Sequence, residues 1–359
     1  MKALKFTIPV WLYLAFLCLV WAKATPLYFL LLIAMSRLKP RLGEFSETEL
    51  RQELKFFYGN KLMQRVKIAG AICLVMFSAV LFYLVYVQTP RGWNFAILVL
   101  ATAYNNGSFL LPLAHDFSHA HSAGKRRLGD LLLIILGLPF FHVDHIYGHH
   151  EQVGTSRDKG SARLNQSFYE FLINSFPQRI KRSYSPDSDL PRAVKTRLLR
   201  ANYLFTGLLA VFGAGLYVIQ PLLLWFWLGQ VIGGYVIYEL TNYVQHYGLR
   251  RLPGEAVGIG HSWNSYFKYP NYVAWFLMVH SPHHVEQPLH KIRSLFGPRL
   301  PYSPYQMLLL ALYPPLWFRV MNPLVAKSRG HAINNQDIPR TPVAGIPLTK
   351  NYDIYDTSV

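Results

Sequence analysis

Cysteine is almost absent from this chain, which holds two cysteines in 359 residues. Cys18 and Cys73 lie in apolar stretches far apart in the sequence, so neither a disulfide framework nor a CxxC metal site is available. The chain also has no GxGxxG fingerprint for a dinucleotide and no cysteine cluster for an iron–sulfur centre. Any electrons that it uses must therefore come from another protein.

Charge is also scarce, because 15% of the residues are charged and 52% are hydrophobic. This balance favours a single integral-membrane domain over residues 1–359. The 36 basic residues outnumber the 18 acidic ones, and they lie mainly between apolar segments, as expected of cytoplasmic loops. Nucleic-acid binding is the other reading of a net charge of +18, but no recognised motif supports it, so we expect no nucleic-acid partner.

Long apolar stretches predict the membrane-spanning helices, since about 20 apolar residues cross a bilayer. We expect a clean span over 68–87, a return over 93–114, and a hairpin formed by 203–219 and 222–240. The stretch 8–33 is either one long span or a hairpin of two short ones.

We favour the hairpin for 8–33, because it places Lys2 and Lys5 on the basic side and gives six spans in total. The alternative is a cleaved signal peptide that ends at Ala22-Lys23-Ala24. The residues from Leu27 onward are apolar again, which argues against that alternative.

Other segments are predicted not to span. Asp130–Phe141 is apolar but too short, and we expect it to be buried or re-entrant. Glu151–Arg200 is basic and hydrophilic and predicts a cytoplasmic cap, with a loop at Ser185–Asp189. Gln306–Val320 is predicted to be interfacial or buried, and the tail from Ala326 to lie on the cytoplasmic surface.

Histidines form the most informative pattern in the chain. The spacings HxxxH, HxxxHH and HxxHH each bring imidazoles onto one face of a helix, because residues three and four apart are neighbours there. One tetrahedral zinc cannot use so many ligands, so the set indicates two metals in one pocket. The nine candidate ligands are His115, His119, His145, His149, His150, His246, His280, His283 and His284.

Five further histidines do not complete such a spacing, and we interpret them as structural. His142, three residues before His145, would be a ligand only if that segment is helical, and it stays open. The five are His121, His142, His261, His290 and His331.

Metal-binding imidazoles need a hydrogen-bond partner on the other ring nitrogen. Five carboxylates are close enough in the sequence to be candidates, and Glu239 lies two helical turns before His246. The candidates are Asp116, Asp144, Glu151, Glu239 and Glu286.

With these motifs in view, the chain resembles the membrane-bound alkane hydroxylase family, which includes the xylene and cymene monooxygenases and is distantly related to the fatty-acid desaturases. The resemblance covers 93–284. The run Asn242-Tyr-x-x-His246-Tyr-Gly-Leu249 distinguishes this family from the desaturases, which lack it. The other motifs are His115-Asp-Phe-Ser-His119, Asp144-His-Ile-Tyr-Gly-His149-His150, His261-Ser-Trp-Asn-Ser265 and His280-Ser-Pro-His283-His284.

The resemblance implies an all-α bundle of about six transmembrane helices, with a catalytic core at about 68–300. It implies a histidine-rich diiron cap on the cytoplasmic side of the inner membrane, in which the nine histidines hold two irons. The implied reaction inserts one atom of dioxygen into a terminal or benzylic methyl of a hydrophobic substrate. The implied electron donor is a rubredoxin or ferredoxin-type protein with its reductase.

The sequence departs from the family pattern next to several histidines. Asp116 and Asp144 stand where Glu is usual, Gln245 replaces a Glu, and Met278-Val279 replaces a Gln-Arg pair. These changes put the substrate in doubt more than the chemistry. Two alternatives remain open: a desaturase-like oxidase acting on a lipid, and a histidine-lined metal transporter or sensor.

Overall fold

The computed structural model describes residues 2–37, 42–120, 122–138, 141–185, 192–251, 254–285 and 292–334. Within these ranges the regular elements are helices, and the extended pairings are the isolated bridges Glu44–Phe267 and Asn264–Arg299. Most of the loop predicted at Ser185–Asp189, as well as the tail beyond 334, lies outside the described residues. The predicted all-helical class is confirmed.

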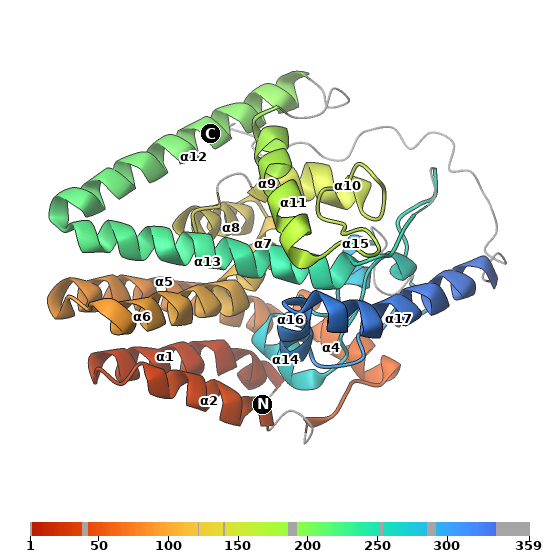
Figure 1. Cartoon of the computed structure of the whole chain (residues 1–359), viewed down its shortest axis with the longest axis horizontal. Coiled ribbons are helices and arrows are strands. Elements are labelled where there is room, and N and C mark those ends of the chain that lie inside the picture. The colour runs from red at the N-terminus through yellow and green to blue at the C-terminus, as the bar shows by residue number, and fades with distance from the viewer. Residues whose placement is uncertain are drawn as a thin grey trace.

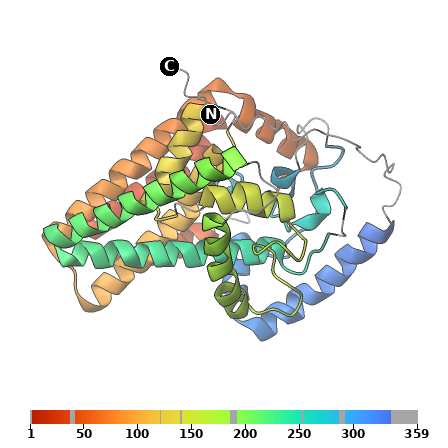
Figure 2. The same cartoon turned by 90° about the horizontal axis from the view of Figure 1, so that it is seen from above.

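Long apolar helices make up one end of the molecule, and mostly shorter helices, together with α17 Pro314–Asn334, make up the other (Figures 1 and 2). Five helices are long and apolar enough to cross a membrane. They are Lys2–Trp21 (η1 Lys2–Thr7 and α1 Ile8–Trp21), α5 Lys61–Gln88, Gly92–Ser118 (α6 Gly92–Asn105, η2 Asn106–Leu110 and α7 Leu111–Ser118), α12 Arg192–Ile219 and α13 Pro221–His246. Four of them contain a predicted apolar stretch, and Lys2–Trp21 contains the first part of 8–33, so this protein is a membrane protein.

The predicted N-terminal hairpin is present. After α1 the chain turns through Lys23, whose φ is 57°, and returns as α2 Pro26–Arg37. The rings of Phe16 and Tyr28 hold the two arms together with centroids 4.8 Å apart. Because α2 has only 12 described residues, it is shorter than a full span, and the count of six spans stays a prediction.

The turns between the long helices gather at one end. Gln88, at the end of α5, donates through Nε2 to the carbonyl of Trp21 at 3.2 Å, which places the first two turns side by side. Trp93 is 84% exposed beside the same turn. Exposed tryptophans at the ends of apolar helices are typical of the membrane–water interface.

The remaining helices, most of them short, form a cap at the opposite end (Figure 1). The segment predicted to be buried or re-entrant is short and non-spanning, with α8 Ala123–Ile135 ending before Gly137, whose φ is 72°. The apolar segment at 306–320, predicted to be interfacial or buried, is divided between α16 Pro304–Ala311 and α17 Pro314–Asn334. It is partly buried, since Trp317 is fully buried whereas Leu309 and Tyr313 are exposed. The other cap elements are α4 Glu47–Gly59, α9 Phe141–Asp144, η3 His145–His149, α10 His150–Gln152, α11 Phe168–Tyr184, η4 Ile259–His261, α14 Lys268–Val273, α15 Ser281–His284, α16 Pro304–Ala311 and α17 Pro314–Asn334.

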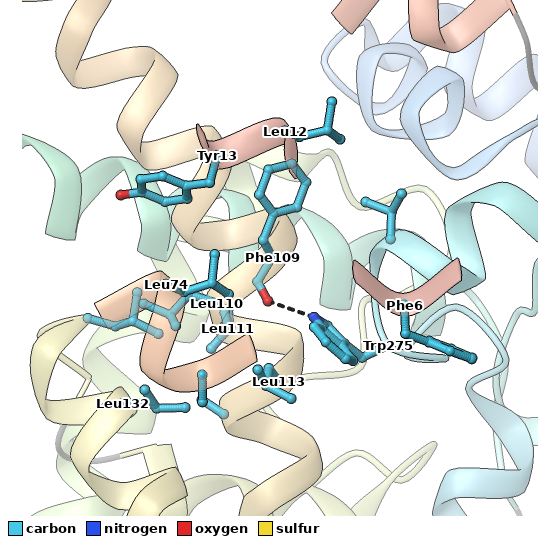
Figure 3. Packing of buried hydrophobic residues seen from close by; sticks show 14 of the residues in the cluster. Phe6, Leu12, Tyr13, Leu74, Phe109, Leu110, Leu111, Leu113, Leu132 and Trp275 are labelled. Atoms are coloured by element: carbon cyan, nitrogen blue, oxygen red, sulfur yellow. Dashed lines mark hydrogen bonds between the residues drawn. The ribbon is translucent and has the colours of Figure 1, made fainter. Parts of the chain in front are cut away.

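Apolar packing links the membrane helices to the cap (Figure 3). Phe6 at the N-terminus stacks near Trp275, with ring centroids 6.3 Å apart. The indole Nε1 of Trp275 donates to the carbonyl of Phe109 at 3.1 Å, which lies in the π-helical turn η2. The segment before α15 is therefore fixed against the helix that carries His115.

Glycine permits the close contact between α13 and η2. A Cβ built on Gly107 would lie 2.6 Å from Cγ2 of Ile237, whereas a Cβ on Gly207 of α12 would meet nothing within 4 Å. We expect Gly107→Ala to destabilise the protein by about 1–3 kcal/mol through overpacking. Gly207→Ala should leave stability unchanged or raise it by about 0.5–1 kcal/mol, because Gly disfavours helix. Unfolding of both variants in detergent micelles tests this, and equal effects would contradict it.

Candidate metal centre

The structure brings all nine candidate histidines together at the end of α13, in two groups. Within each group, one ring nitrogen per histidine lies within 4.8 Å of the others. We call the first set group one and the second set group two. Group one is His115, His119, His145, His150 and His283, and group two is His149, His246, His280 and His284.

The ring nitrogens of each group converge. In group one, the Nε2 atoms of His145 and His150 lie 3.1 Å apart. In group two, Nε2 of His280 lies 2.9 Å from Nε2 of His246 and 2.9 Å from Nε2 of His284. A bound cation would satisfy these three ring nitrogens, which otherwise crowd together without a common partner.

The two groups share one pocket. The ring centroids of His150 and His284, which belong to different groups, are 4.3 Å apart. Those of His283 and His284 are 5.3 Å apart. Two metal positions at this spacing would be neighbours rather than independent sites.

A π-helical turn decides which group receives each histidine of HxxxHH. Residues 145–149 form η3, in which hydrogen bonds join residues i and i+5. His145 therefore faces His150, and His149 turns to group two. The expectation that His145 and His149 share a face was wrong, because it assumed α-helical spacing.

The other two spacings follow α-helical geometry. His115 lies on α7 and His119 at its C-terminal end, four residues apart in group one. His280 and His284 are also four residues apart, in group two, and His283 points to group one. Upstream of this segment, Trp275 and Phe276 have φ values of 51° and 63°, an uncommon left-handed pair that reverses the chain toward α15.

Burial keeps the imidazoles neutral. Desolvation lowers the pKa of His145, His150, His280 and His284 well below the usual value, and neighbouring imidazoles lower it further. For His283 the pKa falls to about 3 for the same reason. Neutral imidazole is the form that binds metal. Within the described residues, buried ring nitrogens without a hydrogen-bond partner include Nε2 of His115, His149 and His283 and Nδ1 of His145, His280 and His284.

Asp158 supplies a hydrogen-bond partner for one imidazole. Its carboxylate lies 2.9 Å from Nδ1 of His149, which leaves Nε2 of His149 directed at group two. The backbone N–H of Gly160 and the hydroxyl of Ser161 also donate to Asp158, at 2.8 and 2.6 Å. The His149 and Ser161 contacts lower the carboxyl pKa despite burial. Sequence reasoning missed Asp158, because it follows His149 by nine residues in a hydrophilic stretch without helical spacing.

The carboxylates that the sequence nominated have other partners. Asp116 accepts from Nζ of Lys67 at 2.9 Å, and that ammonium lies 3.5 Å from the ring centroid of Phe57. Glu151 is exposed, and its carbonyl accepts from Arg251 at 2.8 Å. Glu286 lies outside the described residues.

Asp144 and Glu239 both pair with Arg179 of α11. Nε of Arg179 lies 2.9 Å from Asp144 Oδ2, and Nη1 donates to Glu239 Oε1 at 2.8 Å. Tyr235 donates to the same Glu239 oxygen. Burial raises the pKa of Asp144, and the nearby guanidinium opposes that shift. The hypothesis that Glu239 orients His246 directly was wrong, since the carboxylate of Glu239 bonds to Arg179 and Tyr235 instead.

Comparison with known proteins agrees with this geometry. The family model described as fatty acid desaturase matches residues 89–307. An alkane 1-monooxygenase 2 of Alcanivorax borkumensis is 33% identical over 271 residues, covering 69% of each chain. The chain belongs to the alkane hydroxylase branch of the fatty acid desaturase family.

Other members of the branch are similar over comparable lengths. Alkane 1-monooxygenase 1 of Pseudomonas aeruginosa is 33% identical over 249 residues, 65% of this chain and 63% of that protein. The xylene/toluene monooxygenase hydroxylase component of Pseudomonas putida is 26% identical over 230 residues, 62% of each chain. The match thus spans somewhat less than two thirds of the length of each of these two relatives.

The motif that distinguishes the alkane hydroxylases, 242–249, holds the end of α13 in place. Tyr243 donates to the carbonyl of Gln166 at 2.7 Å, and Tyr247 donates to Asn322 at 2.7 Å. Gly248 has a φ of 70° and donates to the carbonyl of Ala162 at 3.0 Å. These bonds tie His246 to the loop that carries Asp158 and to α17.

Gln245, the residue before His246, uses its side-chain amide to bind the segment that leads to α15. Its side-chain Nε2 donates to the carbonyl of Leu277 at 3.1 Å, and its backbone carbonyl accepts from the N–H of Trp263 at 2.7 Å. The residue therefore joins α13 to the chain leading to α15, a role that an amide performs without a charge.

Of the five remaining histidines, His261 lies outside both groups, and the side chains of the other four are outside the described residues. His261 is buried, and its Nε2 lies 3.4 Å from Glu255 Oε1, while Nδ1 accepts from the N–H of Gly258 at 2.9 Å. It is absent from both groups, in agreement with a structural role. His121 and His290 are outside the described residues, as are the side chains of His142 and His331.

Proposed function

We propose that this protein is a membrane monooxygenase that hydroxylates a terminal or benzylic methyl of a hydrophobic substrate, such as an alkane, an alkyl-aromatic or a terpene. The observation that carries the proposal is the convergence of nine histidines in two adjoining groups at the end of apolar helices, where the Nε2 atoms of His115, His149 and His283 are buried without a hydrogen-bond partner. We further propose that residues 1–359 form one domain with its catalytic core at about 68–300.

The histidines fit a pair of irons. Group one would hold one and group two the other, through neutral imidazoles that suit iron. A pair of irons held there would supply the activation of dioxygen. Hydroxylation consumes two electrons and two protons, places one oxygen atom in the product and releases the other as water.

The chain's own residues prepare this pocket. Asp158 fixes the tautomer of His149 by accepting from Nδ1, so that Nε2 is free to bind. Phe141 stacks against His145 with centroids 4.7 Å apart and contacts Tyr238 at 5.3 Å. These rings give the site an apolar wall that excludes water and suits a hydrocarbon.

The relatives support the substrate class. Their names specify alkanes for one set and xylene or toluene for another. These compounds share a methyl group, terminal in an alkane and benzylic in xylene or toluene, and have no ionisable group. A lipid-soluble substrate of this kind would reach the site from the bilayer.

We also propose an inner-membrane location with the metal centre on the cytoplasmic side. Two of the three turns at the far end of the long helices hold one basic residue each, Lys23 and Arg91, and the third, at Gln220, holds none. The histidine end carries most of the 36 basic residues. By the positive-inside rule that end is cytoplasmic. A rubredoxin or ferredoxin-type donor with its reductase would supply electrons there.

The test is a product screen in the presence of labelled dioxygen. Purified, iron-loaded protein with a reduced electron donor should convert an alkane or alkylbenzene to an alcohol that carries the label. An unsaturated product without the label would instead identify a desaturase. Metal movement across vesicles without any reductant would identify a transporter.

Acid should destabilise the metal-free protein. Burial lowers the pKa of His283 to about 3. In the unfolded chain its pKa returns to about 6.5. Between these values the native state binds fewer protons, so its stability is full above about pH 6.5 and is lost as the pH falls toward 3. Chemical unfolding at pH 7.5 and 5.5 measures this loss, and equal free energies at the two pH values would contradict the assignment.

A further inference from the structure

The motif at 261–265 supplies no ligand to either group of histidines, yet its last four residues are at most 1% exposed. The backbone N–H of Trp263 donates to the carbonyl of Gln245 at 2.7 Å. That of Ser265 donates to the carbonyl of Met278 at 2.8 Å. The motif therefore lies between the end of α13 and the chain that leads to α15, the two elements that supply most of group two.

Ser262 is placed to orient the imidazole of His246. Its Oγ lies 3.4 Å from Nδ1 of His246, while Nε2 of the same ring lies 2.9 Å from Nε2 of His280. A metal in group two would bind Nε2 in its unprotonated form, so Nδ1 would keep the proton and donate a hydrogen bond to the hydroxyl. Asp158 performs this role for His149 at the shorter distance of 2.9 Å, so the effect of Ser262 should be the smaller one.

Asn264 holds the first residue of α15. Its Oδ1 accepts from the backbone N–H of Ser281 at 2.8 Å, and its Nδ2 donates to Oγ of Ser281 at 2.7 Å. Nδ2 also donates to the carbonyls of Ser262 and Pro298, each at 3.1 Å. Because α15 has only four residues and His280 at its N-cap makes no side-chain cap bond, the orientation of this helix depends on bonds from outside it.

The pair formed by Asn264 and Ser281 is closely packed. A Cβ built on Gly297 would lie 3.0 Å from Nδ2 of Asn264 and 3.1 Å from Oγ of Ser281. The hydroxyl of Ser281 in turn donates to the carbonyl of Ser262 at 2.9 Å. These residues form one buried, hydrogen-bonded unit that joins α15 to the motif.

We propose that Ser262 and Asn264 are positioning residues of group two. Ser262 fixes the tautomer of His246, and Asn264 fixes α15 so that His280 and His284 are directed at the same metal ion. The proposal rests on the proposed function in taking group two as a metal site. Group two receives two of its four histidines from the segment that begins at His280, whereas group one receives one of five. A shift of α15 should therefore weaken group two more than group one.

Cobalt(II) titration of the metal-free, detergent-solubilised protein tests these roles, because the visible absorption of cobalt bound to imidazole reports binding without turnover. We expect Asn264→Ala to raise the Kd of one cobalt site by about 10–100-fold and that of the other by less than about threefold. Ser262→Ala should raise the Kd of the same site by about 3–10-fold, and Ser262→Thr, which keeps the hydroxyl, should stay within about twofold of the wild type. In His284→Ala, where group two is incomplete, adding Asn264→Ala should change the remaining site by less than about threefold.

Asn271→Ala is the matched control. Asn271 is also fully buried and donates to the backbone carbonyls of Ser265 and Phe267 at 2.8 and 2.9 Å, but its side-chain bonds reach neither α13 nor α15. Chemical unfolding of the metal-free variants should show a loss of stability for both Asn264→Ala and Asn271→Ala, since each loses buried hydrogen bonds. Only Asn264→Ala should change the Kd of a cobalt site.

Three results would overturn the positioning role: equal weakening of both cobalt sites by Asn264→Ala, unchanged affinity in both Asn264→Ala and Ser262→Ala, or the same loss of affinity in Asn271→Ala. If Asn264→Ala does not fold, the two variants of Ser262 decide, since a loss in Ser262→Ala with recovery in Ser262→Thr supports the role and no loss overturns it. Iron-loaded wild type that hydroxylates no substrate would refute the proposed function, and the cobalt titrations decide the positioning role in either case.

Discussion

Arg179→Met should destabilise the protein by about 3–5 kcal/mol, the cost of leaving buried charge without its partner. Arg179 is fully buried and contacts two buried carboxylates, those of Asp144 and Glu239. Removing the guanidinium leaves both carboxylates in an apolar site, so at least one must take up a proton. The free energy of unfolding in detergent micelles, measured against denaturant, gives the loss directly.

The same substitution should also disturb the metal centre. Asp144 directly precedes η3, and Glu239 lies two turns before His246, so Arg179 holds two ligand-bearing elements together. Arg179→Lys should recover only part of the stability, because one ammonium cannot reproduce the two directed contacts of the guanidinium.

An exposed ion pair provides the control for Arg179. Arg163→Met removes the pair with Glu170, whose side chains are 63% and 50% exposed. It should change stability by less than about 1 kcal/mol. A loss for Arg179→Met no larger than that for Arg163→Met would contradict the role assigned to the buried pair.

His284→Ala should abolish hydroxylation, with a loss well beyond 100-fold. Replacing a residue that only hydrogen-bonds to a metal ligand costs about 10–100-fold in metal affinity or activity. We propose that His284 is a ligand itself, so its loss should cost more. It sits in group two with its Nε2 2.9 Å from Nε2 of His280 and is close to His150 of group one. Product formation under saturating donor measures the effect.

His261→Ala is the matched control for His284→Ala. His261 is equally a histidine from the family motifs and is buried, but it contacts Glu255 and Gly258 and belongs to neither group. This variant should keep its bound metal and lose less than about tenfold in activity, an effect of packing alone. Equal losses in the two variants would show that the grouping does not identify the ligands.

Most of the fold could be predicted from the sequence, because a bilayer requires long apolar helices. The stretches 68–87, 93–114, 203–219 and 222–240 all fall inside long helices. The hairpin after Trp21 was also expected, because it places Lys2 and Lys5 on the basic side. The span count stays open, because α2 is described only to Arg37.

The set of candidate histidines was predictable, but their division was not. Helical spacing alone pairs His145 with His149, and the π-helical turn pairs His145 with His150 instead. A π-turn has no strong sequence signature, since tertiary packing stabilises it. Nothing in the local sequence distinguishes the two pairings.

Hydrogen-bond partners were the least predictable part of the site. Nearness in sequence suggested Asp116 and Asp144, yet both pair with basic residues from distant elements, Lys67 and Arg179. Asp158 reaches His149 through a loop closed by Gly160 and Ser161. Such contacts depend on loop conformation and on the packing of α11, which residue spacing does not encode.

Metal analysis of the purified protein tests the central claim most directly. Elemental analysis of the iron-loaded wild type and of His284→Ala should give about two irons per chain for the first and about one for the second, with magnetic coupling between the irons only in the wild type. One iron per chain in the wild type, or two uncoupled irons, would contradict two adjoining groups of histidines acting as one centre.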